Sequence, residues 1–341
     1  MGWLRHRKLS MLGRFSLLLV LVLVLFTGNL AFGTVTIPLD AVWQSLTGQT
    51  PSKLSWATII WQFRLPKAIT AALAGAALSV SGLQMQTLFQ NPLAGPSVLG
   101  VSAGASFGVA VLVLFLQGEA LSLLNSLSVV AAASLGAAAV MIPVVVAARL
   151  VKQPIALLVL GLLLSYATSG VVNILLYFSV PEQIQSYLIW TFGSFSLVTW
   201  SQIPMLVTII TLGLVASLLL SPWLNVLLLG EEQAVSLGLN ITQLRVMVIV
   251  NVAILTGAIT GFCGPIAFLG VAVPHLARNL SLDGDHRVMM PMVMLLGAGL
   301  GLFADLVAQL PGQNTVLPLN SVMALIGTPI VIMTILRRYR R

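Results

Sequence analysis

Long apolar runs alternate along this chain with short stretches that are charged or rich in proline and glycine. Most runs are close to the length of about 20 apolar residues that an α-helix needs to cross a bilayer. We therefore expect an all-α polytopic membrane protein in which residues 1–341 form one transmembrane domain. The pattern predicts ten spans, over residues 15–33, 67–89, 97–116, 128–148, 155–178, 201–221, 244–263, 266–279, 289–304 and 318–336.

The composition agrees with this pattern. The chain is 58% hydrophobic and 7% charged, with a mean hydropathy of +1.06, whereas soluble domains carry about 25% charged residues. The net charge of +8 does not indicate nucleic-acid binding, because the basic residues lie in short connections and at the two ends of the chain. Residues 1–33 begin like a signal peptide, but we expect them to remain as the first span.

The distribution of basic residues predicts the orientation. With ten spans, thirteen Lys and Arg residues fall on the side that holds both termini, and three fall on the other side. Positive charge marks the cytoplasmic face, so both termini are expected in the cytoplasm. The three exceptions are Lys53, Arg64 and Lys67. Arg64 and Lys67 could be anchors at the lipid surface, or they could dock an acidic partner outside the membrane.

A faint internal repeat accompanies the spans. Gly75, Ala76, Gly82 and Pro92 recur in the same order at an offset of 182 residues. The second and seventh spans run in opposite directions under the predicted orientation, so the copies would be inverted. Inverted repeats are common in membrane transporters.

Motifs for catalysis are missing from the chain. No lysine follows the glycine that a Walker A motif requires, the three histidines lack ligand spacing, and no nucleophile–base pair stands out. The sequence therefore predicts no catalytic residue, no metal site and no bound cofactor. The single cysteine, Cys263, is expected to be a small buried residue. For Asp305, at the end of the ninth span, structural pairing or capping is favoured over a proton relay.

The connection between the sixth and seventh spans, about residues 222–243, is longer than a plain turn needs. Glu231 and Glu232, followed by apolar residues and Gly238, predict a short helix with an acidic start and a glycine end. Such a helix at the inner surface could contact a soluble partner, or it could only lie on the membrane.

The next break in the pattern is FCGPIAFLGVAVPHLARNL, residues 262–280. Gly264 and Pro265 are expected to end the seventh span and begin a short eighth span, because proline starts a helix more readily than it continues one. Pro274 would remove a backbone hydrogen bond late in that span. For His275 we favour a hydrogen bond at the helix end, or a place near a partner's surface, over a metal ligand.

Four separated stretches together resemble one family. RLPKAITAALAGAALSVSGLQMQTLFQNPLAGPSVLGVSAGA, LLLGEEQAVSLGLN, GPIAFLGVAVPHLARNLSLDGDHR and ALIGTP occur in this order. They resemble the permease subunits of bacterial ABC importers for iron–siderophores, haem and vitamin B12, over roughly residues 60–336. The resemblance implies a second permease subunit, two cytoplasmic ATPase subunits that bind ATP and Mg²⁺, and an extracytoplasmic binding protein. It places the chain in the cytoplasmic membrane.

The resemblance also implies roles for particular residues. Arg64 and Lys67 match positions that meet acidic residues of the binding protein, whereas Gln309 and Leu317 depart from charged positions of the family. The implied contacts to the ATPase are Glu231, Glu232, Ala234, Leu237 and Gly238. Candidates for the translocation pathway, on the fifth and tenth spans, are Ser165, Thr168, Asn173, Asn320, Ser321 and Met323. Packing inside the protein is an equal alternative for each of these six.

The expected cargo is a ferric siderophore, with haem or cobalamin as the alternatives. An ion-driven secondary transporter would need carboxylates in the middle of the membrane. The eight acidic residues lie in connections or near the ends of spans, which argues against that class. A purely structural membrane subunit is the third alternative.

Overall fold

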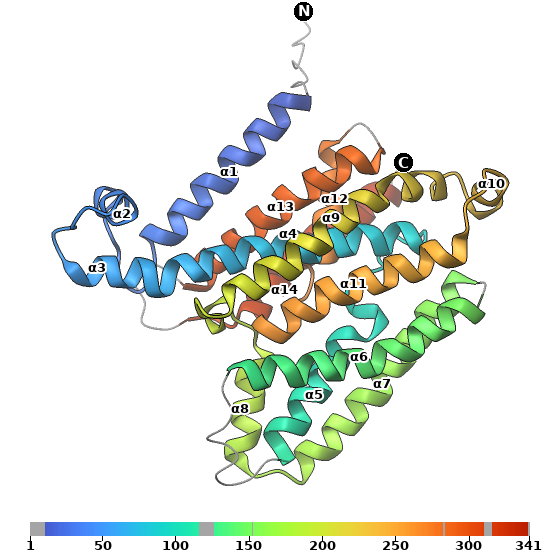
Figure 1. Cartoon of the computed structure of the whole chain (residues 1–341), viewed down its shortest axis with the longest axis horizontal. Helices are drawn as coiled ribbons and strands as arrows, with labels where there is room; N and C mark the ends of the chain where they lie inside the picture. Colours follow the sequence, from blue (N-terminus) through green and yellow to red (C-terminus); the bar gives the residue numbers. More distant parts are fainter. Residues whose placement is uncertain (1–10, 116–125, 152, 282–283, 310–315, 340–341) are drawn as a thin grey trace, which may run out of the picture.

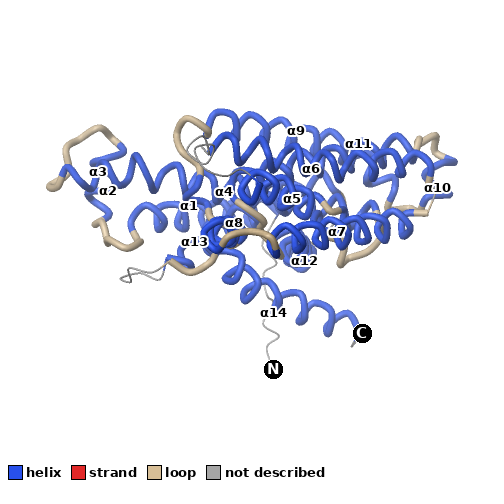
Figure 2. Tube along the Cα trace, turned by 90° about the horizontal axis from the view of Figure 1, so that it is seen from below, coloured by secondary structure: helices blue, strands red, loops and turns tan. Residues whose placement is uncertain are grey.

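The computed structural model describes residues 11–115, 126–151, 153–281, 284–309 and 316–339. Every regular element in these ranges is helical, as Figures 1 and 2 show. The basic residues predicted at 5–8, Lys152 and the last two arginines lie outside the described residues. Seven helices in the described part are long and apolar enough to cross a membrane. The chain is therefore a polytopic helical membrane protein.

A helix lies at each of the ten predicted spans. These helices are α1 (Met11–Ala31), α4 (Leu65–Leu88), α5 (Val101–Phe115), α6 (Ser126–Leu150), α7 (Pro154–Tyr177), α9 (Ile203–Leu227), α11 (Ile241–Cys263), α12 (Leu269–Leu280), α13 (His286–Gln309) and α14 (Leu319–Tyr339). The predicted eighth span is the short one, with 12 residues in α12, and Pro274 lies inside it as expected.

The predicted end of the sixth span, at residue 221, was wrong. Helix α9 continues through Pro222 to Leu227. Proline inside a helix removes one backbone hydrogen bond and usually bends or ends the helix. Here the hydroxyl of Ser221 donates to the carbonyl of Leu218 at 2.5 Å. This carbonyl lies one turn before Pro222, which has no N–H to donate to it. The connection to α11 is therefore shorter than predicted, and it contains α10 (Glu231–Ser236).

Several short elements were not predicted. Helices α2 (Leu39–Leu46) and α3 (Leu54–Thr58) precede a π-helical segment, Ile59–Arg64, that leads without interruption into α4. Helix α8 (Pro181–Thr191) joins α7 to α9. The continuous helix Leu54–Leu88 has 35 residues, a length of about 52 Å at the usual helical rise. Because the hydrocarbon core is about 30 Å thick, this helix extends beyond it.

Helix α4 lies at the centre of the bundle, surrounded by α9, α11, α12 and α13 (Figure 1). Small residues permit this packing. A Cβ on Gly75 would lie 2.0 Å from the carbonyl oxygen of Gly297 in α13, and one on Gly82 would lie 1.7 Å from that of Gly270 in α12. Close helix contacts at glycine are a common way to build membrane bundles.

Figure 1 shows α10 at one end of the bundle and α2 with α3 at the opposite end. Helices α4 and α11 run antiparallel between these ends, which is the sense expected for inverted copies of the repeat. The guanidinium of Arg14 in α1 donates to the carbonyl of Leu280 at the end of α12, at 2.7 Å. Helix α1 therefore begins at the α10 end.

The break between α11 and α12 follows the predicted pattern. Helix α11 ends at Cys263, and Gly264 has a φ of +78°. Phe268 also has a positive φ, +68°, a conformation that is strained for a bulky residue. Helix α14 supports it, because the backbone N–H of Ala267 donates to Asn320 Oδ1 at 3.1 Å. A Cβ on Gly327 of the same helix would lie 2.4 Å from the Cβ of Phe268.

Candidate functional site

The connection that holds α10 is exposed at one end of the bundle. Gly230 and Gly238 flank the helix with φ values of +104° and +86°, which glycine adopts without a Cβ clash. Ala234 is fully buried, and Glu232 and Leu237 are exposed. The predicted short helix with an acidic start and a glycine end is confirmed.

The connection also exposes apolar side chains. Leu228, Leu229, Val235 and Leu237 each expose more than half of their surface. Apolar side chains gathered at an exposed position usually mark a contact surface. Glu232 lies on the same short helix and adds negative charge. The arrangement suits a soluble protein partner with a mixed apolar and basic surface.

Arg245, near the start of α11, fixes α10 to the bundle. Its side chain is buried, and it forms an ion pair with Glu231 at 3.1 Å. It also donates to the carbonyl of Val151 in the connection between α6 and α7, at 2.7 Å. Three segments that are distant in sequence therefore meet at one guanidinium. Glu231 is consequently held by Arg245 and partly exposed, while Glu232 is exposed.

A second polar cluster at the same end joins α4, α9 and α13. Asn225 Nδ2 lies 2.6 Å from Asp285 Oδ1. Asn225 Oδ1 lies 2.8 Å from both the backbone N and the Nδ1 of His286. The other ring nitrogen, Nε2, lies 2.7 Å from Thr87 Oγ1. Sequence reasoning missed this cluster, because its four members are spread over 199 residues.

His275 and Arg278 lie beside that cluster, on α12. His275 is buried, and its Nδ1 lies 3.4 Å from Arg278. The guanidinium of Arg278 also donates to the side-chain oxygen of Gln86 in α4. The predicted hydrogen bond for His275 near the helix end is thus present. Among the described residues, no three His, Cys, Asp or Glu side chains gather as metal ligands.

Asp285, in the connection before α13, accepts hydrogen bonds from the backbone N–H of Arg287 at 2.8 Å and from Asn225. These bonds favour the charged form, so they hold the pKa of Asp285 below its ordinary value. The carboxylate is exposed. Asp285 is therefore an exposed hydrogen-bond acceptor at the edge of the cluster.

At the opposite end of the bundle, Arg64 and Lys67 are buried rather than displayed. Arg64 exposes only 5% of its surface. Its guanidinium donates to the carbonyl of Leu30 at 2.6 Å and to that of Val35. Lys67 Nζ lies 3.1 Å from Asp305 Oδ2. The predicted structural pairing of Asp305 is confirmed. In the chain by itself, neither basic side chain is presented for docking.

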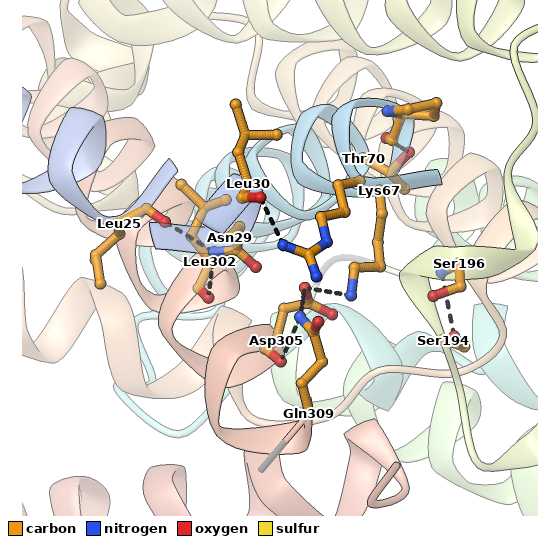
Figure 3. A network of polar contacts seen from close by, with 12 residues as sticks. Leu25, Asn29, Leu30, Lys67, Thr70, Ser194, Ser196, Leu302, Asp305 and Gln309 are labelled. Atoms are coloured by element: carbon orange, nitrogen blue, oxygen red, sulfur yellow. Dashed lines mark hydrogen bonds and ion pairs between the residues drawn. The ribbon is translucent and has the colours of Figure 1, made fainter. Parts of the chain in front are cut away.

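Gln309 completes the cluster around Lys67 and Asp305, as Figure 3 shows. Its side-chain amide donates to Asp305 Oδ2 at 2.9 Å and to the backbone carbonyl of Asp305 at 3.2 Å. Leu317 is exposed, and its backbone N–H donates to the carbonyl of Ala308 at 2.8 Å. Gln309 thus stabilises the ion pair, whereas Leu317 presents an apolar side chain at this end of the bundle.

The three pathway candidates on α7 lie on the outer part of the bundle, where Figure 1 shows α7 beside α5 and α6. Ser165 Oγ and Thr168 Oγ1 donate to carbonyls one turn earlier in the helix, at 2.8 and 2.7 Å. Asn173 is exposed. A polar residue exposed on a membrane helix usually faces a partner helix or a water-filled cavity.

The candidates on α14 have three different surroundings. Asn320 uses its side chain to hold the N–H of Ala267, so it has a structural role. Ser321 is exposed, whereas Met323 is fully buried inside the chain. Of the six pathway candidates, Asn173 and Ser321 are therefore the most accessible.

A third polar cluster lies inside the bundle and was not predicted. Asn251 Nδ2 of α11 lies 2.8 Å from Ser217 Oγ of α9 and 3.1 Å from Gln84 Oε1 of α4. All three side chains are buried. Hydrogen bonds of this kind join helices in membranes, where no water can satisfy the polar groups. The cluster joins α4, α9 and α11.

Seven helices of the described part are apolar and long enough to span a membrane. The bundle has a central helix, and an exposed connector lies at one end (Figure 1). These features define a polytopic membrane protein. The chain belongs to the FecCD transport family, whose sequence model matches residues 19–337. It is thus a permease of that family, as its relatives are.

Two relatives illustrate the match. The chain is 36% identical to the vitamin B12 import system permease protein BtuC of Vibrio cholerae over 322 residues, 94% of this chain and 91% of that protein. It is 32% identical to the hemin transport system permease protein HmuU of Yersinia pestis over 322 residues, 94% of each. The resemblance that the sequence motifs indicated is confirmed.

A solved structure gives the same result for the fold. It shows an inward-facing conformation of a metal-chelate type ABC transporter, and it matches with a TM-score of 0.82 at 28% identity. The match covers 96% of this chain and 99% of that one.

Proposed function

We propose that this chain is the transmembrane permease subunit of an ATP-driven importer that moves a bulky metal chelate across the bacterial cytoplasmic membrane. The observation that carries the proposal is the likeness of 94% of the chain to permeases of import systems. The exposed connector at α10 supports it, because a permease without its own nucleotide site needs a surface for a separate ATPase.

For the cargo, the motifs first suggested a ferric siderophore. The two relatives described above are named for vitamin B12 and hemin. These cargoes are all metal ions held in large organic ligands, and we propose this class. A transport assay of each chelate with its matching binding protein would distinguish the three candidate cargoes.

We propose that the ten predicted spans all cross the membrane and that both termini are cytoplasmic. The excess of basic residues on one side favours this orientation. It places α10 in the cytoplasm and the Arg64–Lys67 cluster outside. An accessible cysteine introduced at the exposed Leu237 should react with a membrane-impermeant reagent only in inverted vesicles, and reaction from outside would refute the orientation.

The proposed assembly has one further permease, two ATPase subunits that bind ATP and Mg²⁺, and an extracytoplasmic binding protein. The α10 connector provides the ATPase contact through Glu232 and Leu237, and the exposed side of α7 faces the second permease. At the outer end, Arg64 and Lys67 are used by contacts inside the chain. We propose that they affect docking by holding the outer mouth in shape.

The proposed mechanism couples nucleotide binding by the ATPase subunits to a change between two conformations of the permease. Nucleotide binding draws the ATPase subunits together, and α10 carries that motion to α9 and α11. The cavity then opens to the other side of the membrane, as in alternating access. Nucleotide can drive this change only by binding the two conformations with different affinities.

The test is reconstitution in liposomes with the ATPase and the binding protein. Uptake of the labelled chelate should require ATP and should persist when ion gradients are collapsed. Uptake that continues with an inactive ATPase and stops without an ion gradient would refute the proposal in favour of a secondary transporter. Deletion of residues 229–238 should abolish uptake, and unchanged transport would favour a purely structural subunit.

A further inference from the structure

His286, the first residue of α13, contacts two other helices at this end of the bundle. Its side chain is buried, with 3% of its surface exposed. One ring nitrogen contacts Asn225 of α9 and the other contacts Thr87 of α4, at 2.8 and 2.7 Å. A histidine with partners on both nitrogens has a defined orientation, and its partners decide which nitrogen carries the proton.

The partners of Asn225 fix the direction of its amide. Its Nδ2 faces the carboxylate of Asp285, which can only accept a hydrogen bond. Its Oδ1 receives the backbone N–H of His286, which can only donate. The atom that faces the His286 ring is therefore a carbonyl oxygen. Since a carbonyl oxygen cannot donate, the ring nitrogen Nδ1 must carry a hydrogen.

The neutral ring then has a lone pair on Nε2, and Thr87 is the donor to it. The hydroxyl of Thr87 has a second acceptor, the carbonyl of Leu83 in its own helix, at 3.0 Å. The hydroxyl hydrogen can serve only one of the two at a time. In the tautomer with its hydrogen on Nδ1, Nδ1 donates to Asn225 and Nε2 accepts from Thr87, so the ring bonds both neighbouring helices.

The position of this contact gives it a role. Asn225 lies in the last turn of α9, directly before the connection that contains α10. Thr87 lies in the last turn of α4, the central helix of the bundle. A displacement of α10 is passed along the chain to α9, and the Asn225–His286–Thr87 contacts link α9 to the centre of the bundle.

We propose that His286 is a positioning residue which, in its Nδ1–H tautomer, transmits the movement of α10 from α9 to α4. The coupling role rests on the proposed function, whereas the tautomer follows from the contacts alone. The chain offers a matched pair of variants for a test. Thr87→Val removes the hydroxyl that contacts His286. Thr70→Val makes the same change on the same helix at a buried threonine whose hydroxyl bonds its own helix, to Pro66 O at 2.8 Å.

The measurement is the amount of chelate transported per ATP hydrolysed in the reconstituted complex. A net hydrogen bond contributes about 1 kcal/mol, which corresponds to a factor of about five. We expect Thr87→Val to lower the ratio about fivefold while ATP hydrolysis continues, and Thr70→Val to leave it unchanged. Thr87→Ser should restore it, because the serine hydroxyl can reach the same nitrogen. Equal ratios in the two valine variants would overturn the proposal.

The tautomer is tested separately, on wild-type complex with ¹³C,¹⁵N-labelled histidine in lipid bilayers. The chain has three histidines, so a His286→Gln sample identifies the signal. We expect Nδ1 protonated and Nε2 unprotonated, with a shift of the Nε2 signal in Thr87→Val and none in Thr70→Val. A proton on Nε2, alone or together with one on Nδ1, would overturn the inference. Wild-type complex that shows no ATP-driven uptake would refute the proposed function, while the spectrum would still decide the tautomer.

Discussion

Replacing Lys67 with methionine tests whether the cluster of Arg64, Lys67 and Asp305 is structural. In the wild-type chain Lys67 Nζ lies 3.1 Å from Asp305 Oδ2, and the two side chains expose 11% and 8% of their surface. Methionine keeps the approximate length of the lysine stem but removes the charge. The carboxylate of Asp305 would then be buried with only Gln309 as a side-chain partner.

The magnitude follows from this geometry. Two unit charges 3.1 Å apart attract each other by about 5 kcal/mol at an effective dielectric constant of about 20. Removing one member of a buried pair costs about 3–5 kcal/mol, because the remaining charge is left uncompensated. Replacing both members by apolar residues often costs little. We therefore expect Lys67→Met to lower the free energy of unfolding by about 3–5 kcal/mol, and Lys67→Met with Asp305→Leu to recover most of it.

The assay is denaturant unfolding of the purified protein in detergent micelles. Lys53→Met is the matched control, because Lys53 is exposed and packs over the ring of Trp56. A surface substitution of this kind should change stability by less than about 0.5 kcal/mol. The reasoning would be refuted if Lys67→Met were as stable as Lys53→Met while its affinity for the binding protein fell. Lys67 would then be a solvated docking residue, as the resemblance implied.

Three further variants probe other parts of the structure. Gly75→Ala should lower the unfolding temperature strongly, because the added Cβ would lie 2.0 Å from a backbone oxygen. Gly257→Ala is the control and should have little effect, because the nearest neighbours of its Cβ would lie 3.8 Å away. Similar shifts of the unfolding temperature in both variants would contradict the close helix contact. Asp285, whose pKa is lowered, should stabilise the folded chain above about pH 4 and lose this effect as the pH falls further, through its folded pKa. Unfolding temperatures measured against pH should therefore fall toward low pH more steeply in wild type than in Asp285→Asn, and parallel curves would be the contrary result. Glu231→Gln removes the ion pair with Arg245 and should reduce ATP-driven uptake more than basal ATP hydrolysis; a vesicle assay that finds both unchanged would exclude a coupling role for the pair.

The helices were predictable because the lipid-facing and buried residues of a membrane helix are both apolar, which leaves a run that is visible in sequence. The short helices α2, α3 and α8 leave no such run, so they were missed. The end of α9 was misplaced because Pro222 looks like a helix terminus, whereas the structure accommodates it inside the last turns. The hydroxyl of Ser221 bonds the carbonyl of Leu218 there, and the apolar pattern does not show that contact.

The sites were predictable only where their residues are adjacent in sequence. Helix α10 is one continuous stretch, and both its acidic start and its glycine end were recognised. The contacts of Arg64 join the π-helical segment before α4 to the end of α1 and the segment after it, over 34 and 29 residues, so its burial had no local signal. His286 was one of three histidines, and only the packed helices reveal that both of its nitrogens have partners.

The support that α14 gives to the break before α12 has a consequence for biosynthesis. The stretch around Ala267 and Phe268 leaves the ribosome well before α14 does, because Asn320 and Gly327 are more than 50 residues further along the chain. Until α14 has been inserted, the Ala267 N–H lacks its Asn320 acceptor within an apolar bundle, where an unsatisfied group costs several kcal/mol. We therefore expect α11 and α12 to lack their final arrangement until α14 has been inserted. Chains truncated before residue 319 should accumulate as substrates for membrane quality-control proteases.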